Sequence, residues 1–209
     1  MAKKHYLKLE HSIFLFILLG ILLLIMPVSF ESTRQAGFIS KWNEKFNRVE
    51  YMFSVINAHI TEDILKSMNR AKTPEEREAI LFALVKPYLR ISDNRPRRYK
   101  PKYINGSKVY KGQTYFFDDF YFAENNTIVG IKDIKSDKSE DALFLMMFDI
   151  NGILPPNRWG KDIYGVSIFD GGKIEPFGFD LDMKELKKDC FETGISCSYY
   201  YKIGGGFEE

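Results

Sequence analysis

Oxygen-bearing side chains gather in residues 148–162, which read FDINGILPPNRWGKD. Asp149 and Asn151 precede Gly152 in the Asp-x-Asn-Gly order that opens calcium loops, because alternate oxygen side chains converge on the ion and glycine allows a tight turn. An EF-hand loop counted from Asp149 would need glutamate at its twelfth position, where this chain has Gly160. Two interpretations therefore stand: an ion site of another kind, or side chains that cap their own turns.

The two cysteines, Cys190 and Cys197, lie close together near the C-terminus, with no histidine nearby to complete a metal set. This spacing favours a short disulfide loop. Because a disulfide needs an oxidising compartment, the pair indicates that the C-terminal part lies outside the cytoplasm. The alternative is two reduced thiols.

The sequence contains no enzyme constellation. Its histidines, His5, His11 and His59, are far in sequence from both cysteines, and neither a phosphate-binding glycine loop nor a G-x-S-x-G elbow is present. Asp118-Asp119 is a carboxylate pair, but adjacent acids in a strand more often point to opposite faces. We therefore expect no catalytic activity.

Residues 90–111 are strongly basic, with interleaved tyrosines and the turn dipeptide Asn105-Gly106. Positive charge can hold a phosphate backbone while aromatic rings stack on bases, so nucleic acid is one candidate ligand. A solvated linker, or a surface facing an anionic envelope polymer, is favoured over it. The predicted basic surface consists of Arg95, Arg97, Arg98, Lys100 and Lys102.

The elements that must position these groups begin with an apolar helix. Residues 13–28 cover roughly 24 Å at ~1.5 Å per residue, close to the ~30 Å hydrocarbon core of a bilayer. We predict a transmembrane helix over 12–30, preceded by a short basic cytoplasmic leader at 1–11. The lysines before it place the N-terminus in the cytoplasm and the rest outside, in the periplasm or at the cell surface. A cleaved secretory signal is the alternative, but no A-x-A-like site follows Met26.

Beyond this segment, apolar residues recur at steps of three and four, which predicts an amphipathic continuation of the helix over 31–62. A coiled-coil stalk is the alternative, although the aromatic content suits packing on a sheet. The stripe consists of Trp42, Phe46, Val49, Phe53, Ile56 and Ile60.

A second helix is predicted to start at Thr73-Pro74, with Thr73 as N-cap and Glu76 completing a capping box. Pro87 is expected to kink or end it.

Residues 63–209 predict a head built on a sheet. The segments 114–122, 127–134, 142–150 and 162–170 have the composition of strands, and Asn125-Asn126 and Gly171-Gly172 suit tight hairpin turns. Helix first and antiparallel sheet second make the expected fold class α+β.

The N-terminal register resembles that of the type IV pilin and type II secretion pseudopilin family. Those subunits carry a basic leader ending in glycine, then a hydrophobic helix with glutamate fifth and often proline twenty-second. Counted from Tyr6, Glu10 is fifth and Pro27 is twenty-second, while His5 departs from the glycine that the family's leader peptidase requires. The resemblance implies a pilin-like fold in which Glu10 pairs with a neighbouring subunit's amino terminus during assembly, and in which Pro27 belongs to the assembly helix.

The head also resembles pilin-like proteins through a D-x-N-G-x-x-x-P-N-x-x-G-x-D segment. The matching residues are Asp149, Asn151, Gly152, Pro156, Asn157, Gly160 and Asp162. A loop near the C-terminus can bind calcium in pseudopilins, so the resemblance implies a Ca²⁺ site at Asp149, Asn151 and Asp162.

The function expected from these features is that of a membrane-anchored structural subunit of a type IV pilus or a secretion pseudopilus. Its partners would be membrane lipid, other pilin-like subunits and inner-membrane assembly proteins. The alternative is a permanently anchored binding protein, outside the cytoplasm, whose ligand is DNA or an anionic envelope polymer.

Overall fold

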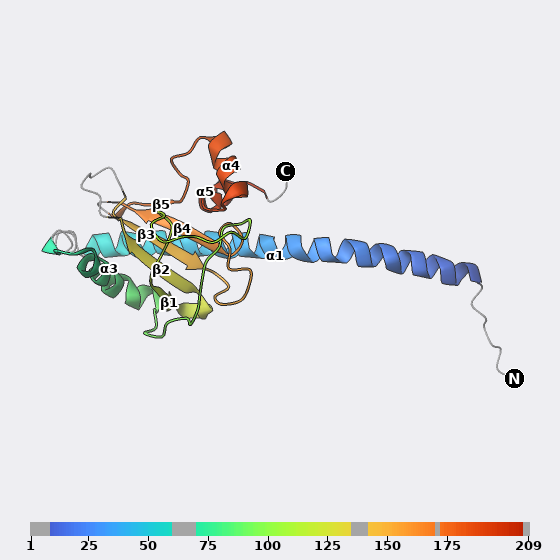
Figure 1. The fold of residues 1–209 in the computed structure, drawn as a ribbon, viewed down its shortest axis with the longest axis horizontal. Coiled ribbons are helices and arrows are strands. Elements are labelled where there is room, and N and C mark those ends of the chain that lie inside the picture. Colours follow the sequence, from blue (N-terminus) through green and yellow to red (C-terminus); the bar gives the residue numbers. More distant parts are fainter. Residues whose placement is uncertain (1–8, 60–69, 135–141, 170–171, 207–209) are drawn as a thin grey trace. The chain divides into compact units, whose positions relative to one another are not determined.

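A computed structural model describes residues 9–59, 70–134, 142–169 and 172–206 (Figure 1). The side chains of residues 9, 10, 23–29, 31 and 59 lie outside this description. The chain divides into two compact units, residues 1–37 and 38–209.

Helix α1 runs from Leu9 to His59, so residues 9–37 of it belong to the first unit and the rest to the second. Among the described residues, no helix has both the length and the apolar character needed to cross a membrane. Residues 1–8 of the leader predicted over 1–11 lie outside the described residues, and the boundaries predicted at residues 11, 30 and 62 stay predictions.

The second unit, which we call the head, buries one face of α1. The buried side chains are Phe38, Trp42, Phe46, Val49, Met52, Phe53 and Ile56. Five of the six stripe residues expected from the three-and-four spacing are in this set, while Ile60 lies outside the described residues. The periodicity therefore identified the packing face correctly.

Helix α3 (Pro74–Leu89) begins as predicted. The backbone N–H of Glu76 donates to the Thr73 hydroxyl at 3.2 Å, and the Glu76 carboxylate accepts from the Lys72 N–H at 2.7 Å. The helix continues two residues past Pro87 and ends at Arg90, whose φ of 50° turns the chain out of the helix.

The head contains one five-stranded antiparallel sheet with the strand order β1-β2-β3-β4-β5. The α+β fold class and the antiparallel sheet are thus confirmed. The strands are β1 (Phe120–Phe122), β2 (Ile128–Asp133), β3 (Phe144–Asp149), β4 (Ile163–Ile168) and β5 (Ile174–Pro176).

Two features differ from the predicted head. The strand expected over 114–122 is reduced to residues 120–122, because the segment before it lies over the sheet and buries Phe117 there instead of pairing. After β5 the chain adds two short helices that the periodicity did not indicate, α4 (Met183–Glu192) and α5 (Cys197–Lys202).

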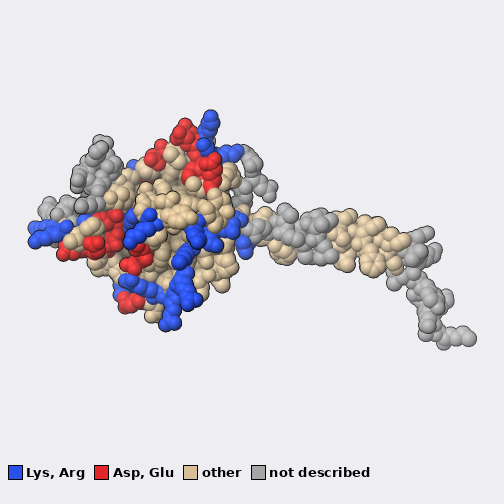
Figure 2. Space-filling view, viewed as in Figure 1, with Lys and Arg blue, Asp and Glu red and all other residues tan. Residues whose placement is uncertain are grey.

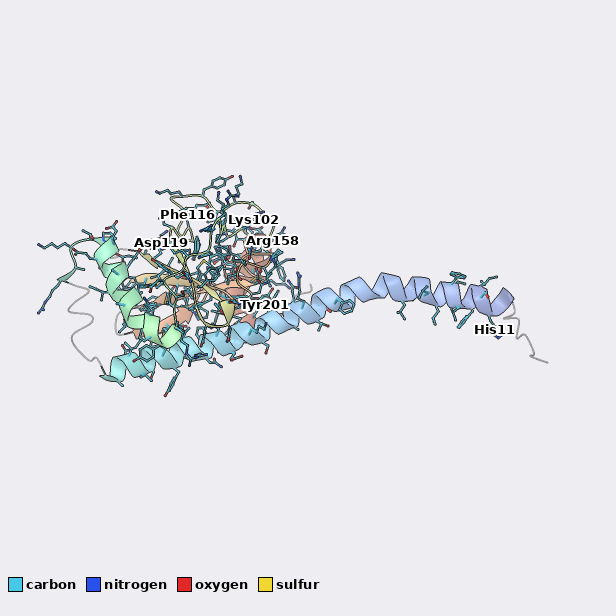
Figure 3. The ribbon with its side chains drawn as sticks, turned by 90° about the horizontal axis from the view of Figure 1, so that it is seen from below. His11, Lys102, Phe116, Asp119, Arg158 and Tyr201 are labelled. Atoms are coloured by element: carbon cyan, nitrogen blue, oxygen red, sulfur yellow. A yellow bond between two sulfur atoms is a disulfide. The ribbon has the colours of Figure 1, made fainter. Side chains whose placement is uncertain are left out.

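Alternate residues of each strand face different apolar layers, as the pleat requires. Met146 and Val166 pack in the cluster that contains the buried face of α1, whereas Leu145 and Ile163 pack in a second cluster with Trp159. Figure 3 shows α1 on one side of the sheet and the labelled Lys102, Phe116 and Arg158 on the other. The loops of residues 95–119 therefore cover the face that α1 leaves open.

Candidate functional site

The predicted assembly residues Glu10 and Pro27 both lie in α1, and their side chains lie outside the described residues. The described side chains from Ile13 to Leu22 are apolar. Nine of them are between 48% and 74% exposed: Ile13, Phe14, Leu15, Phe16, Ile17, Leu18, Leu19, Ile21 and Leu22. A continuous apolar surface of this kind marks a site that contacts lipid or another protein.

The oxygen-rich loop of residues 149–162 joins β3 to β4, and its two carboxylates are fully buried. Asp149 accepts from the Tyr99 hydroxyl at 2.6 Å and from the Asn151 N–H at 3.1 Å. Asp162 accepts from the N–H groups of Asn157 and Arg158 at 2.8 and 2.7 Å. The carboxylates therefore cap turns of their own loop, which was one of the two interpretations open from the sequence.

Burial and the neighbouring Asp162 carboxylate raise the pKa of Asp149 well above its usual range. Hydrogen bonds from the Tyr99 hydroxyl and from backbone N–H groups oppose this shift but do not cancel it. The Asp149–Asp162 pair is consequently a costly arrangement unless a positive or hydrogen-donating group lies between the loop oxygens.

Asn157 supplies such a group. The inward end of its amide lies 2.9 Å from the Gly152 carbonyl, 2.8 Å from the Leu154 carbonyl and 3.1 Å from the Asp149 carboxylate. Because all three neighbours are acceptors, the inward atom must be the amide nitrogen, which donates to them. The sequence pattern singled out Asn157 without giving it a role, and its φ of 50° is one that asparagine tolerates better than most residues.

The loop oxygens fit a hard cation only in part. Asn151 Oδ1 is buried without a hydrogen-bond partner, as an ion ligand would be. The Asn157 amide, however, already lies among the other inward oxygens. The described residues hold no group of three or more His, Cys, Asp or Glu side chains placed to bind a metal. Calcium at Asp149, Asn151 and Asp162 stays a prediction, and the hydrogen bonds of the Asn157 amide are an alternative closure of the loop that leaves Asn151 Oδ1 without a partner.

The predicted basic surface separates into three parts. Arg95 is engaged: its guanidinium lies 2.5 Å from the Asp119 carboxylate, donates to the Tyr121 hydroxyl at 3.0 Å and covers the Tyr121 ring. Arg97 and Arg98 are exposed. Lys100 and Lys102 instead line a pocket with other basic and aromatic residues.

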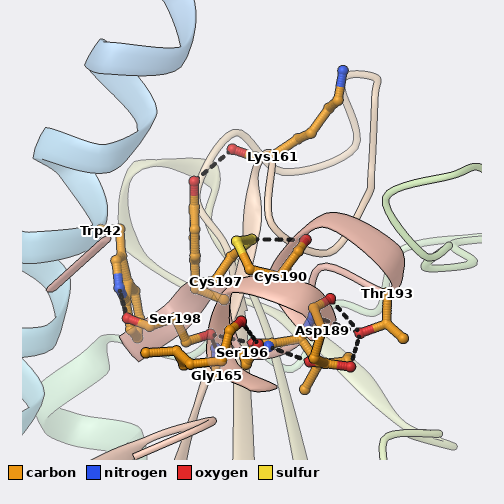
Figure 4. The surroundings of a disulfide bond; sticks show 12 residues. Trp42, Lys161, Gly165, Asp189, Cys190, Thr193, Ser196, Cys197 and Ser198 are labelled. Carbon is orange, nitrogen blue, oxygen red and sulfur yellow. Dashed lines mark hydrogen bonds between the residues drawn. A yellow bond between two sulfur atoms is a disulfide. The ribbon is translucent and has the colours of Figure 1, made fainter. Parts of the chain in front are cut away.

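Cys190 and Cys197 form a disulfide, as their spacing favoured (Figure 4). The bond joins α4 to α5, and Ser198 follows it directly. The Ser198 carbonyl accepts from Trp42 Nε1 at 2.9 Å, and its hydroxyl accepts from the Gly165 N–H at 2.9 Å. The cross-linked C-terminal segment is thereby attached to both α1 and β4.

No protein-family model, curated protein or solved structure matches this chain. The functional argument therefore depends on the residues themselves.

Proposed function

We propose that the chain is a membrane-anchored, pilin-like structural subunit of a type IV pilus or a type II secretion-like pseudopilus. The first part of α1 enters the bilayer and then packs against the same helix of neighbouring subunits, while the head remains outside the cytoplasm. The N-terminus stays on the cytoplasmic side. The activity is assembly, and no catalysis is proposed.

The observation that carries the proposal is the row of exposed apolar side chains from Ile13 to Leu22. Burying a large apolar side chain is worth about 1.5–3 kcal/mol, so leaving nine of them in water is unfavourable. Beyond Phe38 the same helix, α1, has one buried face that packs on the head. A helix that anchors a head at one end and offers apolar surface at the other suits assembly.

In this mechanism, Glu10 forms an ion pair. An acid that borders hydrocarbon is costly unless it meets a cation. The amino terminus of a neighbouring subunit, or a lysine of an uncleaved leader, would supply that cation and fix the offset between adjacent helices.

Replacing Glu10 with Ala tests this role. We expect Glu10→Ala to reach the membrane fraction at the wild-type level, with its disulfide formed, and to be lost from cross-linked, sedimentable assemblies in the cells that produce it. Glu50→Ala is the matched control, because Glu50 is an exposed acid on the head part of α1. Assembly of Glu10→Ala at the wild-type level would show that Glu10 has no such role.

The second candidate, a permanently anchored binding protein, is favoured by the pocket that Lys100 and Lys102 line. His5, at the position of the leader glycine, also suits an uncleaved anchor. The intact mass of the protein purified from its own membranes distinguishes the two candidate functions. A mature chain beginning at Tyr6 supports the assembling subunit, and a chain that begins at Met1 or Ala2 supports the anchor.

A further inference from the structure

A pocket of about 470 Å³ opens on the head between the chain segments 99–102, 108–111 and 115–120. It lies on the sheet face opposite α1, where Figure 3 labels Lys102 and Phe116. Its volume is in the range of sites that hold one small molecule or one unit of a polymer. Assembly through α1 would leave this face free.

The rim of the pocket is positively charged. Lys100, Lys102, Lys108 and Lys111 are all exposed, and none forms an ion pair with a described residue. Asp118 is the one carboxylate in the lining. Figure 2 shows Lys and Arg side chains gathered in a band on the face that the green segment crosses in Figure 1. Unpaired ammonium groups around a hollow favour an anionic ligand.

Aromatic rings make up most of the rest of the lining. They are Tyr99, Tyr110, Tyr115, Phe116, Phe117 and Phe120. Tyr99 is fixed by Asp149 and packs edge to face on Phe120 at 4.8 Å, and Tyr115 packs on Phe177 at 4.9 Å. Tyr110 is 63% exposed, so its ring is available to a ligand.

The loop of residues 149–162 supports this pocket from behind. Lys102 donates its N–H to the Asn157 carbonyl at 3.1 Å and accepts from the Trp159 N–H at 2.9 Å. The turn that carries Tyr110 is closed by Gln113, which accepts from the Tyr110 N–H at 2.7 Å. Hydrogen bonds therefore hold the backbone that carries Lys102 and Tyr110 before any ligand arrives.

We propose that this pocket binds single-stranded nucleic acid, with one base against the aromatic wall at Tyr110 and the flanking phosphates at the lysines. Unpaired bases stack on aromatic side chains, and phosphates are held by ammonium charges without sequence preference. An acidic polysaccharide fits less well, because its many hydroxyls need acceptors as well as donors. Among the lining side chains, the acceptors are the Asp118 carboxylate and the hydroxyls of Tyr99, Tyr110 and Tyr115, and the Tyr99 hydroxyl is already bonded to Asp149.

The test is fluorescence anisotropy of a labelled oligothymidylate of about twelve nucleotides, titrated with the full-length protein in detergent micelles. Lys108→Gln with Lys111→Gln should weaken binding and lower the slope of log affinity against log salt by about 1.4, or ~0.7 for each lysine. Lys184→Gln with Lys188→Gln, two exposed lysines of α4, is the control of equal charge and should leave the slope unchanged.

A second pair of variants tests stacking. Tyr110→Ala should weaken binding about tenfold, whereas Tyr110→Phe should keep the wild-type affinity because the ring remains. A duplex of the same length should bind more weakly than the single strand, since its bases are already stacked.

Three outcomes would overturn the proposal: equal effects of the two double-lysine variants, no effect of Tyr110→Ala, or stronger binding of polygalacturonate than of the oligonucleotide. The proposal goes beyond assembly, and the assay uses unassembled protein. Its failure therefore leaves the role of Glu10 untouched, and loss of assembly in Glu10→Ala leaves the binding result untouched.

Discussion

Asn157 is the residue that holds the loop between β3 and β4 together. Its amide donates to two carbonyls and to the buried carboxylate of Asp149, and its backbone N–H donates to Asp162. A neutral amide thus occupies the place among three of the loop oxygens that an ion would otherwise take, while Asn151 Oδ1 stays without a partner. The sequence located this loop through its Asp, Asn and Gly pattern. It could not show which side chain faces inward, because that depends on how the closed loop packs.

Replacing Asn157 with Ala should destabilise the head by about 3–4 kcal/mol, from the loss of two amide N–H donors, shared among three acceptors, at ~1 kcal/mol each and from strain of about 1–2 kcal/mol at its positive φ. Asn126→Ala is the matched control, because Asn126 is exposed and has a similar φ of 59°. It should lose only about 1 kcal/mol. Urea unfolding of the full-length protein in detergent measures both.

Adding calcium tests the opposite explanation, in which an ion and not the Asn157 amide holds the loop oxygens. If the amide closes the loop, millimolar Ca²⁺ leaves the thermal midpoint of the wild-type protein where EGTA leaves it. A rise of several degrees with Ca²⁺, together with equal costs for the two alanine variants, would show that an ion and not Asn157 holds the oxygens.

Tyr115 lowers the stability of the head at alkaline pH. Burial, followed by the carboxylates of Asp189 and Asp180, raises the pKa of Tyr115 to about 12, against about 10 in an unfolded chain. Between these values the unfolded state has released the proton and the folded state has not, so stability falls as pH rises through this window. From about pH 8 to about pH 11 this contribution costs roughly 1 kcal/mol.

The Tyr115→Phe variant should therefore lose less unfolding free energy over that pH interval than the wild type, by about 1 kcal/mol. Tyr51→Phe, at an exposed tyrosine of α1, should behave as the wild type. Equal pH dependence of all three proteins would mean that Tyr115 ionises as easily in the folded head as in the unfolded chain.

At the scale of elements, α1 was the most predictable part of the molecule and residues 114–119 the least. A helical stripe is a local pattern, so its spacing alone identified Trp42, Phe46 and Val49 as buried. Residues 114–119 contain the aromatic residues typical of a strand, but tertiary packing of Phe117 over the sheet outweighs that local preference. Helices α4 and α5 escaped prediction because both are short, and they pack on each other while α5 packs on strands β4 and β5.

Trp42 joins α1 both to strand β4 and to helix α5. Its ring stacks on Tyr164 with centroids 5.0 Å apart, and its Nε1 donates to the Ser198 carbonyl. Trp42→Phe keeps an aromatic ring but leaves that buried carbonyl without its donor, so we expect a loss of about 2–3 kcal/mol of unfolding free energy.

Tyr51→Ala on the exposed side of the same helix should change stability by no more than about 0.5 kcal/mol. Denaturant unfolding, followed by tyrosine fluorescence or circular dichroism, compares the two. A Trp42→Phe protein as stable as the wild type would mean that the bond to Ser198 contributes nothing to the folding of the head.

At the scale of the whole molecule, the disulfide bears on where the protein is located, because a disulfide persists in an oxidising compartment. Its presence was predictable from two nearby cysteines, but its attachment to α1 and β4 through Ser198 joins residues far apart in sequence and needed the structure. The pocket rim also needed the structure to be seen. Lys108 and Lys111 lie near Lys100 and Lys102 only because the loop folds back on itself.

Replacing both Cys190 and Cys197 with Ala should lower the unfolding free energy by about 2–3 kcal/mol, the value expected for a small closed loop. In thermal unfolding, the reduced wild-type protein and the doubly substituted protein should have the same midpoint, below that of the oxidised wild-type protein. In intact cells, the wild-type cysteines should react with a maleimide only after reduction. Labelling without reductant would contradict a head outside the cytoplasm.

The bond between Trp42 and Ser198 also constrains when the protein can fold. The two residues are separated by 156 positions, and both groups are buried. The ribosome must therefore have made nearly the whole chain before the pocket around Trp42 can close. Until then the aromatic face of α1 is uncovered during synthesis, and exposed apolar surface of this kind makes an incomplete chain prone to aggregation.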